Sequence, residues 1–523
     1  MKVLSLVRVL LFAVALATPR LSQSTKLNLP LSGAQDVYRY EMSGDGKRVV
    51  YLADQDVVGV PNLYSVGLGG GEPKRLESRS CSQFMISPDS RRVVFSRFGS
   101  SLSSVPIDGS QASIDLAPYT NAFDVTSDGR TVVYMAGGSL NGSLYRVPID
   151  GSGAPVPIDT SGNIHFLFKL TPDGRRVVYL REGTIRFQAS MGHVCSAPLD
   201  GSGPPVVLNS LQSPCSIGSF VIDPTSAWLV FREGSQQTFS RGLFTVPLDG
   251  SAAPVLLNAP LGPGGALLPF TEFSRPRFTP DGSRIVYLLD VGSFRGDVYS
   301  APIDGSKASI RLSAPPDDHT ITFRITLDGG RVIYLADQEA AHAYELYSVP
   351  IRGDTPPIKV NAPLVPGGSV TTFKLSPDGK RLAYVADPEL ADHYDVYLAM
   401  LDPGHEVIRV SDPDVSPYVY PVTFSALEFV PDGSLLVYTG YDAGLQLYAV
   451  PLQGDRRPWR LDGPPVEGGS VQSSDAFPFN SADDYNVRIC AHGKLAVYLA
   501  DEDEDGVYEL FASPLSRPRL GRR

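Results

Sequence analysis

The residues best suited to chemistry lie close together near the end of the chain: Asp501, Asp503, Asp505, Val507 and Glu509. A calcium ion needs several converging oxygen atoms, and calcium loops supply them from alternate positions around a glycine. In this run the carboxylates occupy positions 1, 3, 5 and 9, with a backbone carbonyl at 7 and a glycine at 6. The spacing predicts a calcium site, and a solvated acidic turn is the alternative interpretation.

Three other loops keep part of this pattern. Each has acidic residues at the first and third positions and an acidic or amide residue at the ninth. Their residues are Asp54, Asp56 and Asn62; Asp337, Glu339 and Glu345; and Asp387, Glu389 and Asp395. The same reasoning predicts weaker calcium sites there.

Signatures of nucleophilic or histidine-based catalysis do not accompany these loops. The sequence has no G-x-S-x-G motif, which a hydrolase nucleophile of the α/β type requires. Its 7 histidines lack the H-x-x-x-H and H-E-x-x-H spacings, and its 4 cysteines lack C-x-x-C. Cys195 and Cys215 are close in sequence and are the expected disulfide pair in an exported chain, whereas Cys81 and Cys490 are expected to be free and buried.

The elements that position these loops are copies of one repeat, about 50 residues apart. Each copy reads Ser/Thr-Pro-Asp-Gly, two polar residues and an apolar run that ends in an aromatic residue, as in TPDGRRVVYL from Thr171. Two copies have lost the Asp-Gly pair, but all ten keep the aromatic residue six positions after the Asp: Tyr51, Phe95, Tyr134, Tyr179, Phe231, Tyr287, Tyr334, Tyr384, Tyr438 and Tyr498.

Each unit divides into four β segments, a to d. Strand a precedes the Asp-Gly turn, strand b carries the aromatic residue, strand c follows the pattern Leu-Tyr-Ser-Val-Pro at 346–350, and strand d closes the unit. Asp-Gly is the usual signal of a two-residue hairpin loop, and the b–c and d–a connections are longer and more varied. The prediction is an all-β chain, a single closed β-propeller of about ten four-stranded blades. Two smaller propellers in tandem are the alternative.

The two ends of the predicted propeller complement each other. Residues 27–33, LNLPLSG, are similar to VNAPL at 360–364, which is a strand d with its exit loop. The last unit ends soon after its own strand c, at Pro514 and Leu515. We therefore expect residues Leu27 to Leu29 to pair beside strand c of blade ten and close the ring, which removes the open sheet edges.

The Pro-Asp-Gly units resemble the propeller repeat of TolB-type proteins and of the propeller domains of prolyl oligopeptidases, from about Leu27 to Leu515. The chain differs from TolB because it has ten units instead of six and no α/β domain ahead of them. The resemblance implies a propeller fold. By analogy with TolB, which binds a peptidoglycan-associated lipoprotein, it also suggests protein binding in the cell envelope.

The first residues are typical of a secretory signal. Lys2 and Arg8 flank the start of an apolar run at 9–16, and Ala15-Leu16-Ala17 is a small-x-small cleavage site. The expected division is a signal peptide with a short spacer at 1–24, the propeller at 25–516 and a basic tail at 517–523. The mature protein is then periplasmic or extracellular, and no later segment is apolar for long enough to be a membrane helix.

The formal net charge of −11 disfavours nucleic acid as a partner, because such binding needs a basic surface. We expect a monomer without catalytic residues, with calcium as its cofactor. It would act as a binding scaffold for an envelope or extracellular protein, peptide or glycan through its long loops.

The alternative is a propeller enzyme, a lyase or glycan hydrolase, whose site is assembled from blade loops at the channel mouth. Clustered carboxylates or histidines with shifted pKa values would mark such a site.

Overall fold

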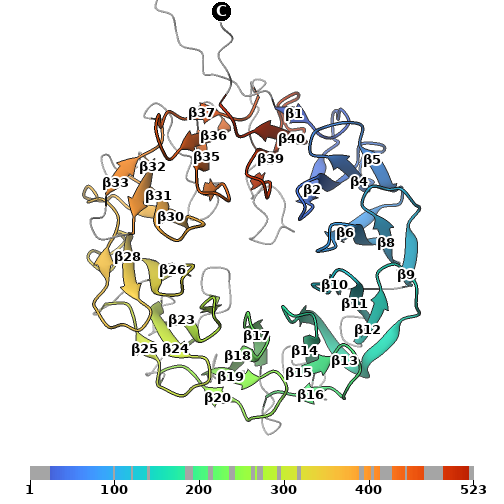
Figure 1. Ribbon diagram of the computed structural model, residues 1–523, viewed down its shortest axis with the longest axis horizontal. Helices are drawn as coiled ribbons and strands as arrows, with labels where there is room; N and C mark the ends of the chain where they lie inside the picture. Colours follow the sequence, from blue (N-terminus) through green and yellow to red (C-terminus); the bar gives the residue numbers. More distant parts are fainter. Residues whose placement is uncertain are drawn as a thin grey trace, which may run out of the picture.

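The computed structural model describes residues 24–97, 101–118, 120, 122–137, 142–182, 192–209, 216–234, 242–260, 266–267, 275–290, 296–314, 320–387, 394–401, 406–412, 427–441, 444–463, 471 and 487–517. All the regular elements in these ranges are β-strands, numbered β1 to β40 in chain order. They form antiparallel sheets that stand side by side around one axis (Figure 1). None of the described segments is a helix that could cross a membrane. The predicted signal peptide lies outside the described residues.

The first half of the ring contains blades 1 to 5, each built from strands a to d in sequence order. Their strands are β2 (Val37–Met42), β3 (Arg48–Ala53), β4 (Asn62–Gly67) and β5 (Lys74–Glu77); β6 (Cys81–Ile86), β7 (Arg92–Arg97), β8 (Leu102–Pro106) and β9 (Ile114–Ala117); β10 (Ala122–Val125), β11 (Thr131–Ala136), β12 (Gly142–Pro148) and β13 (Val156–Leu170); β14 (Arg176–Glu182), β15 (Gly192–Pro198) and β16 (Val206–Val207); and β17 (Ser216–Ile222), β18 (Trp228–Gly234), β19 (Gly242–Pro247) and β20 (Val255–Leu256). The long strand β13 pairs with both β12 and β14, so it is strand d of blade 3 and strand a of blade 4.

The second half contains blades 6 to 10. Their strands are β21 (Ala266–Leu267), β22 (Arg277–Phe278), β23 (Arg284–Asp290), β24 (Gly296–Pro302) and β25 (Ile310–Arg311); β26 (Thr320–Ile325), β27 (Arg331–Ala336), β28 (Glu345–Pro350) and β29 (Ile358–Lys359); β30 (Val370–Leu375), β31 (Arg381–Ala386), β32 (Asp395–Met400) and β33 (Val407–Arg409); β34 (Leu427–Phe429), β35 (Leu435–Tyr441), β36 (Leu445–Pro451) and β37 (Trp459–Arg460); and β38 (Val487–Ile489), β39 (Leu495–Ala500), β40 (Glu509–Pro514) and β1 (Thr25–Lys26). In blade 6, β21 and β22 both pair with β23 and share the place of strand a.

The Pro-Asp-Gly segment folds as a hydrogen-bonded turn that is longer than the two-residue loop expected from Asp-Gly. In blade 4 the Thr171 hydroxyl donates to Asp173 Oδ1 at 2.6 Å and accepts from the Arg176 N–H at 3.0 Å. The Thr171 N–H also donates to the Arg176 carbonyl at 3.0 Å, so four residues lie between the bonded pair. Gly174 has a φ of 67°, in the left-handed region that glycine adopts most easily. The hydroxyl, the Asp and the glycine of the motif thus each have a separate role.

The aromatic residue of strand b fixes each blade internally. It is buried in every unit, and in eight blades its ring stacks on an aromatic ring of strand c. The Tyr51 and Tyr64 rings, for example, have centroids 5.3 Å apart. Such a pair adds about 0.5–1.5 kcal/mol beyond the burial of its surface, which explains why the aromatic position persists where Asp-Gly is lost.

The hydrophobic core is divided into ten clusters, one between each pair of neighbouring blades. One cluster joins the first and last blades and contains Leu27, Val37, Val497 and Leu510. Each blade therefore buries its two faces against its two neighbours, as in other repeat folds. This arrangement establishes one ring of ten blades and excludes two separate propellers.

The N-terminal strand completes blade ten, as predicted. Strand β1 pairs antiparallel with β40, with Thr25 opposite Ala512 and Lys26 opposite Phe511. The Leu27 N–H continues the ladder to the Leu510 carbonyl at 2.7 Å, and the Leu510 N–H bonds Asn28 Oδ1 at 2.7 Å. The paired residues begin at Thr25, two positions before the expected Leu27. At the C-terminal end of the strand, the Asn28 side chain, and not the backbone, accepts the hydrogen bond from β40.

Candidate functional site

The acidic loop of blade ten connects β39 to β40 and begins with a buried aspartate. Asp501 Oδ2 accepts the Gly506 N–H at 3.0 Å, and Gly506 has a φ of 78°. The equivalent loops of blades 1 and 7 repeat this contact, from Gly59 N–H to Asp54 at 2.6 Å and from His342 N–H to Asp337 at 2.9 Å. The first acidic position of the predicted calcium loop therefore stabilises the turn of its own loop.

Two further carboxylates of this loop contact the N-terminal strand. The Lys26 ammonium lies between Asp503 and Glu509, with Nζ 2.5 Å from Glu509 Oε2. Glu509 is buried and also accepts the Leu31 N–H at 2.9 Å. Burial opposes the charge of Lys26, but the hydrogen bonds to Asp503 and Glu509 outweigh it and raise the pKa of the lysine.

Other blades neutralise the same acidic positions with a base from strand d. In blade 7, Lys359 Nζ lies 2.7 Å from Glu339 and 2.8 Å from Glu345. Arg75 pairs with Asp56 in blade 1, and Arg409 with Asp395 at 2.8 Å in blade 8. In these four blades the acidic spacing thus coincides with a repeated ion pair, and Lys26 supplies the base for blade ten.

The calcium set does not converge in this arrangement. Among the described residues there is no group of three or more His, Cys, Asp or Glu side chains placed to hold a metal ion. Asp505 is exposed, Asp501 bonds its own loop, and the Lys26 ammonium occupies the space between Asp503 and Glu509. These residues fit a calcium ion only if Lys26 moves away, so calcium binding here stays a prediction. In the partial sites, Glu389 lies outside the described residues.

The described cysteines are buried free thiols. Cys81, Cys195 and Cys490 are all buried, and burial raises the pKa of Cys195 to about 11. Such thiols are poor nucleophiles near neutral pH. Cys215 lies outside the described residues, but Cys195 is a free thiol, so the expected disulfide between these two residues is not formed.

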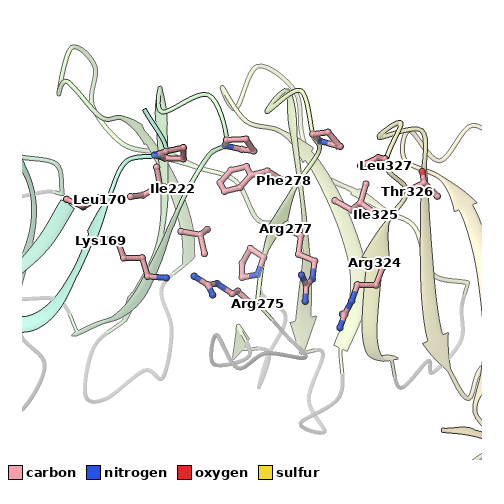
Figure 2. A pocket seen from close by; sticks show the side chains of 15 residues that line it. Lys169, Leu170, Ile222, Arg275, Arg277, Phe278, Arg324, Ile325, Thr326 and Leu327 are labelled. Carbon is pink, nitrogen blue, oxygen red and sulfur yellow. The ribbon is translucent and has the colours of Figure 1, made fainter. Parts of the chain in front are cut away.

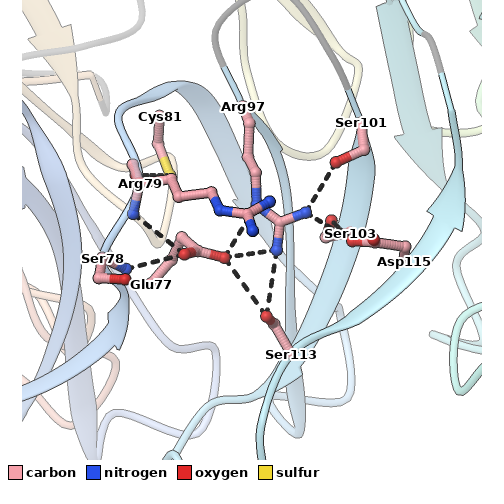
Figure 3. A network of polar contacts seen from close by, with 9 residues as sticks. All are labelled: Glu77, Ser78, Arg79, Cys81, Arg97, Ser101, Ser103, Ser113 and Asp115. Carbon is pink, nitrogen blue, oxygen red and sulfur yellow. Dashed lines mark hydrogen bonds and ion pairs between the residues drawn. The ribbon is translucent and has the colours of Figure 1, made fainter.

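An ion cluster joins blades 1 and 2 (Figure 3), and its Arg97 and Glu77 side chains are buried whereas Asp115 is exposed. Arg97, at the end of β7, donates to Glu77 Oε2 at 2.9 Å from Nε and to Asp115 at 2.5 Å from Nη1. Ser101 Oγ accepts a further bond at 2.7 Å, and the guanidinium lies 5.4 Å from the centre of the Phe95 ring. Because Glu77 ends strand d of blade 1, the cluster connects two adjacent blades, and its contacts are those of a structural link.

Two carboxylates of the long connections, Asp36 and Asp54, lie close enough to influence each other's charge. Burial is the main reason that the pKa of Asp36 is raised, and the Asp54 charge adds to it. Each carboxylate accepts a backbone N–H, Asp36 from Tyr508 at 2.9 Å and Asp54 from Asp36 at 2.8 Å. The pair therefore closes the ring between blades 10 and 1, which is a structural use of these groups.

Strand a lies nearest the axis in the blades where Figure 1 labels it, as at β2, β6, β10, β17, β26 and β30, and these strands form the inner wall of the ring. One position of this wall, two residues before the first residue of the a–b turn, carries charge in eight of the ten blades. From blade 1 to blade 10 its residues are Glu41, Met85, Asp124, Lys169, Val221, Arg277, Arg324, Lys374, Glu428 and Arg488. Equivalent residues of neighbouring blades can touch, since Lys374 Nζ lies 2.6 Å from Glu428.

Four basic side chains gather on one part of this wall, around a hollow of about 540 Å³ between blades 4 and 7. They are Lys169, Arg275, Arg277 and Arg324. Figure 2 shows all four below the turns, with Arg277 and Arg324 pointing away from the turns and Lys169 and Arg275 pointing toward each other. The lining also contains Phe278 and four prolines, and none of the described residues that line it is acidic. We call these four residues the basic arc. The sequence analysis missed it, although alignment of the ten units at this wall position would have shown the charge.

The comparisons with known proteins find no matching family model and no matching curated protein. Among solved structures, the chain is similar to a eukaryotic initiation factor, with 9% identity and a TM-score of 0.46 over 73% of this chain and 90% of that chain. It is also similar to an oligogalacturonate lyase in complex with manganese, with 13% identity and a TM-score of 0.35 over 95% and 96% of the two chains. A putative TolB from Agrobacterium tumefaciens has 16% identity and a TM-score of 0.26 over 57% of this chain and 83% of that chain. At these values the similarities concern the β-propeller fold and carry no argument about function.

Proposed function

We propose that the protein is an exported, non-catalytic propeller scaffold that binds an envelope or extracellular protein, peptide or glycan. The observation that supports this proposal is the contrast between the two faces of the ring. One face, the tight-turn face, carries the a–b and c–d turns. The other, the long-loop face, carries the b–c and d–a connections.

The tight-turn face is nearly uniform around the ring. Every a–b turn has five residues between its strands, as at 43–47 and 376–380. The connections on the long-loop face vary from none, where β13 runs on from blade 3 into blade 4, to 26 residues at 461–486. Variation confined to one face of a rigid scaffold is typical of a binding surface. Much of this face lies outside the described residues.

Export is the second part of the proposal. Cleavage at the predicted site, or anywhere before Thr25, leaves the closing strand β1 intact. The mature chain would then fold into the complete ring after transport.

Photo-crosslinking from single exposed positions tests the face that binds. A photoreactive residue replaces Val57 or His342 on the long-loop face, and Asp108 or Asp304 on the tight-turn face as matched controls. Incubation with envelope extract should give defined crosslinked partners from the first pair only. Crosslinks confined to the second pair would contradict the proposal. Release of cleaved glycan from the same mixture would favour the enzyme alternative.

A further inference from the structure

The b–c connections of the long-loop face divide the ring into two halves by charge. In blades 7 to 10 and blade 1, these connections contain 13 acidic residues and no Lys or Arg. In blades 2 to 6 they contain three Arg and no acidic residue. Blades 10 and 1 are neighbours at the ring closure (Figure 1), so the acidic blades are consecutive around the ring. Such a separation of charge selects partners by their own charge.

Within the acidic half, the loops of blades 10 and 1 form one surface with the connection between them. The Gly33 N–H donates to Glu504 at 3.3 Å, and Gln35 Nε2 donates to the Gln55 carbonyl at 3.1 Å. Gly33 and Gln35 are two positions apart, so the connection brings the two loops together. We call this the closure surface. It comprises residues 27–36, 54–61 and 501–508.

Apolar side chains are exposed on the closure surface. Val57 and Val58, at the tip of the blade 1 loop, are each 57% exposed, and Leu29 of the connection is 40% exposed. Adjoining exposed apolar side chains are typical of interaction sites, whereas isolated ones need no explanation. A partner that binds here therefore has apolar groups to bury.

Two carboxylates of the same surface carry charge that the chain leaves unpaired. Glu504 and Asp505 are exposed, and among the described residues no base pairs with either of them. The lysine that reaches this loop, Lys26, contacts Asp503 and Glu509 instead. A cationic partner would be attracted by Glu504 and Asp505 without displacing Lys26.

A buried amide at the base of the blade 1 loop points to the same kind of ligand. In blades 7 and 10 the ninth loop position is Glu345 or Glu509, and each bonds a lysine ammonium of its own blade. In blade 1 this position is Asn62, which is 2% exposed and whose Oδ1 has no hydrogen-bond partner among the described residues. The base of blade 1, Arg75, pairs with Asp56. A buried oxygen without a partner costs free energy, which an incoming N–H donor would recover.

We propose that the closure surface binds a basic amphipathic segment of a partner protein. Lysine or arginine side chains of that segment contact Glu504 and Asp505, and one of their N–H groups reaches Asn62. Its apolar side chains cover Val57 and Val58. The inference rests on the proposed function, because it names the kind of partner that the long-loop face binds. The same carboxylates repel nucleic acid and anionic membranes.

Fluorescence anisotropy of three labelled peptides with the mature protein tests the inference. The first peptide combines lysine and leucine, the second has glutamate in place of lysine, and the third has glycine in place of leucine. We expect the lysine–leucine peptide to bind about tenfold more tightly than either of the others, with an affinity that falls as salt is added. Equal binding of the glutamate–leucine or the lysine–glycine peptide would overturn the inference.

Glu504→Gln with Asp505→Asn should weaken binding of the lysine–leucine peptide about fivefold, because two exposed charge contacts are lost. Asp108→Asn with Asp304→Asn is the matched control, since it removes two exposed carboxylates from the tight-turn face. The control should leave the affinity within about twofold of the native value.

Val57→Ser with Val58→Ser removes the apolar contacts and should weaken binding of the same peptide about tenfold. Native affinity in the carboxylate variant and in the valine variant, both folded, would contradict the assignment to the closure surface. Crosslinking from His342 separates this inference from the proposed function. If a partner still crosslinks there while the lysine–leucine peptide fails to bind, the long-loop face binds a partner, and only the basic segment is excluded.

Discussion

At the scale of single residues, the acidic loop of blade ten shows how one pattern can support two interpretations. Its carboxylates have the spacing of a calcium loop, but Asp501 bonds its own backbone, and Asp503 and Glu509 contact Lys26. That lysine is more than 470 positions away in sequence, so no local window could show the ion pair. The sequence does contain a hint of this ion pair. Lys359, which forms the equivalent pair in blade 7, stands two residues before Asn361, just as Lys26 stands two residues before Asn28.

Replacing Lys26 by methionine should destabilise the ring. The change leaves the buried Glu509 without its ionic partner, which we expect to lower the free energy of unfolding by about 1–3 kcal/mol. Urea unfolding of the native and variant proteins measures this difference. Lys374→Met is the control, since that pair is more exposed and its loss should cost less than about 1 kcal/mol.

The same variant tests the calcium prediction. A divalent ion could enter between Asp503 and Glu509 once the ammonium is gone, so millimolar calcium should raise the melting temperature of Lys26→Met more than that of the native protein. An unchanged melting temperature in both proteins, with calcium and with chelator, would mean that this loop is purely structural.

At the scale of elements, the repeat was predictable because local signals agree within every unit. The turn motif and the aromatic register identified strands a and b in all ten blades, and the Leu-Tyr-Ser-Val-Pro pattern indicated strand c. Strand d was harder to place, since it is only two residues long in most blades and its ladder is completed by an Asn side chain, as in the bond from Leu346 N–H to Asn361 at 2.8 Å. The continuous strand β13 was also not predicted. Nothing in its sequence indicates that strand d of blade 3 continues into strand a of blade 4 without a loop.

The link between blades 1 and 2 should make stability depend on pH. Burial acts to raise the pKa of Glu77, but the Arg97 guanidinium outweighs it and holds that pKa below its usual range, and the bond from Arg97 also lowers the pKa of Asp115. Folding lowers the pKa of these carboxylates, so their contribution to stability is complete above the pKa values of the unfolded chain, near 4. That contribution is lost as the pH falls through the lower pKa values of the folded protein.

Denaturation measured between pH 3 and pH 7 checks this dependence. Arg97→Gln should lower stability at neutral pH and should flatten the acid limb of the profile, because the two carboxylates then titrate closer to their unfolded values. Arg91→Gln, an exposed arginine on the neighbouring turn, should leave the profile unchanged. An Arg97→Gln profile that keeps the native acid limb would contradict the assignment.

At the scale of the whole molecule, the chain is a ring in which each blade depends on its neighbours. The ten hydrophobic clusters between blades, including the one that contains Leu27, make the ring continuous. Closure could be predicted because the last unit lacks its own strand d, and residues 27–33 are similar to a strand d with its exit loop. The basic arc could not be found from single motifs, since it appears only when blades 4 to 7 stand side by side around the axis.

The central claim, one ring closed by the N-terminal strand, is tested most directly by a disulfide across the closure. Thr25→Cys and Ala512→Cys stand opposite each other on β1 and β40, in the pairing that permits a bridge. We expect nearly complete crosslinking within one molecule under mild oxidation, detected by mass spectrometry of the joined peptides. Thr25→Cys with Ser348→Cys, at the equivalent position of blade 7, should give none. Absence of the 25–512 bridge, or a bridge formed only between two molecules, would contradict the closed ring.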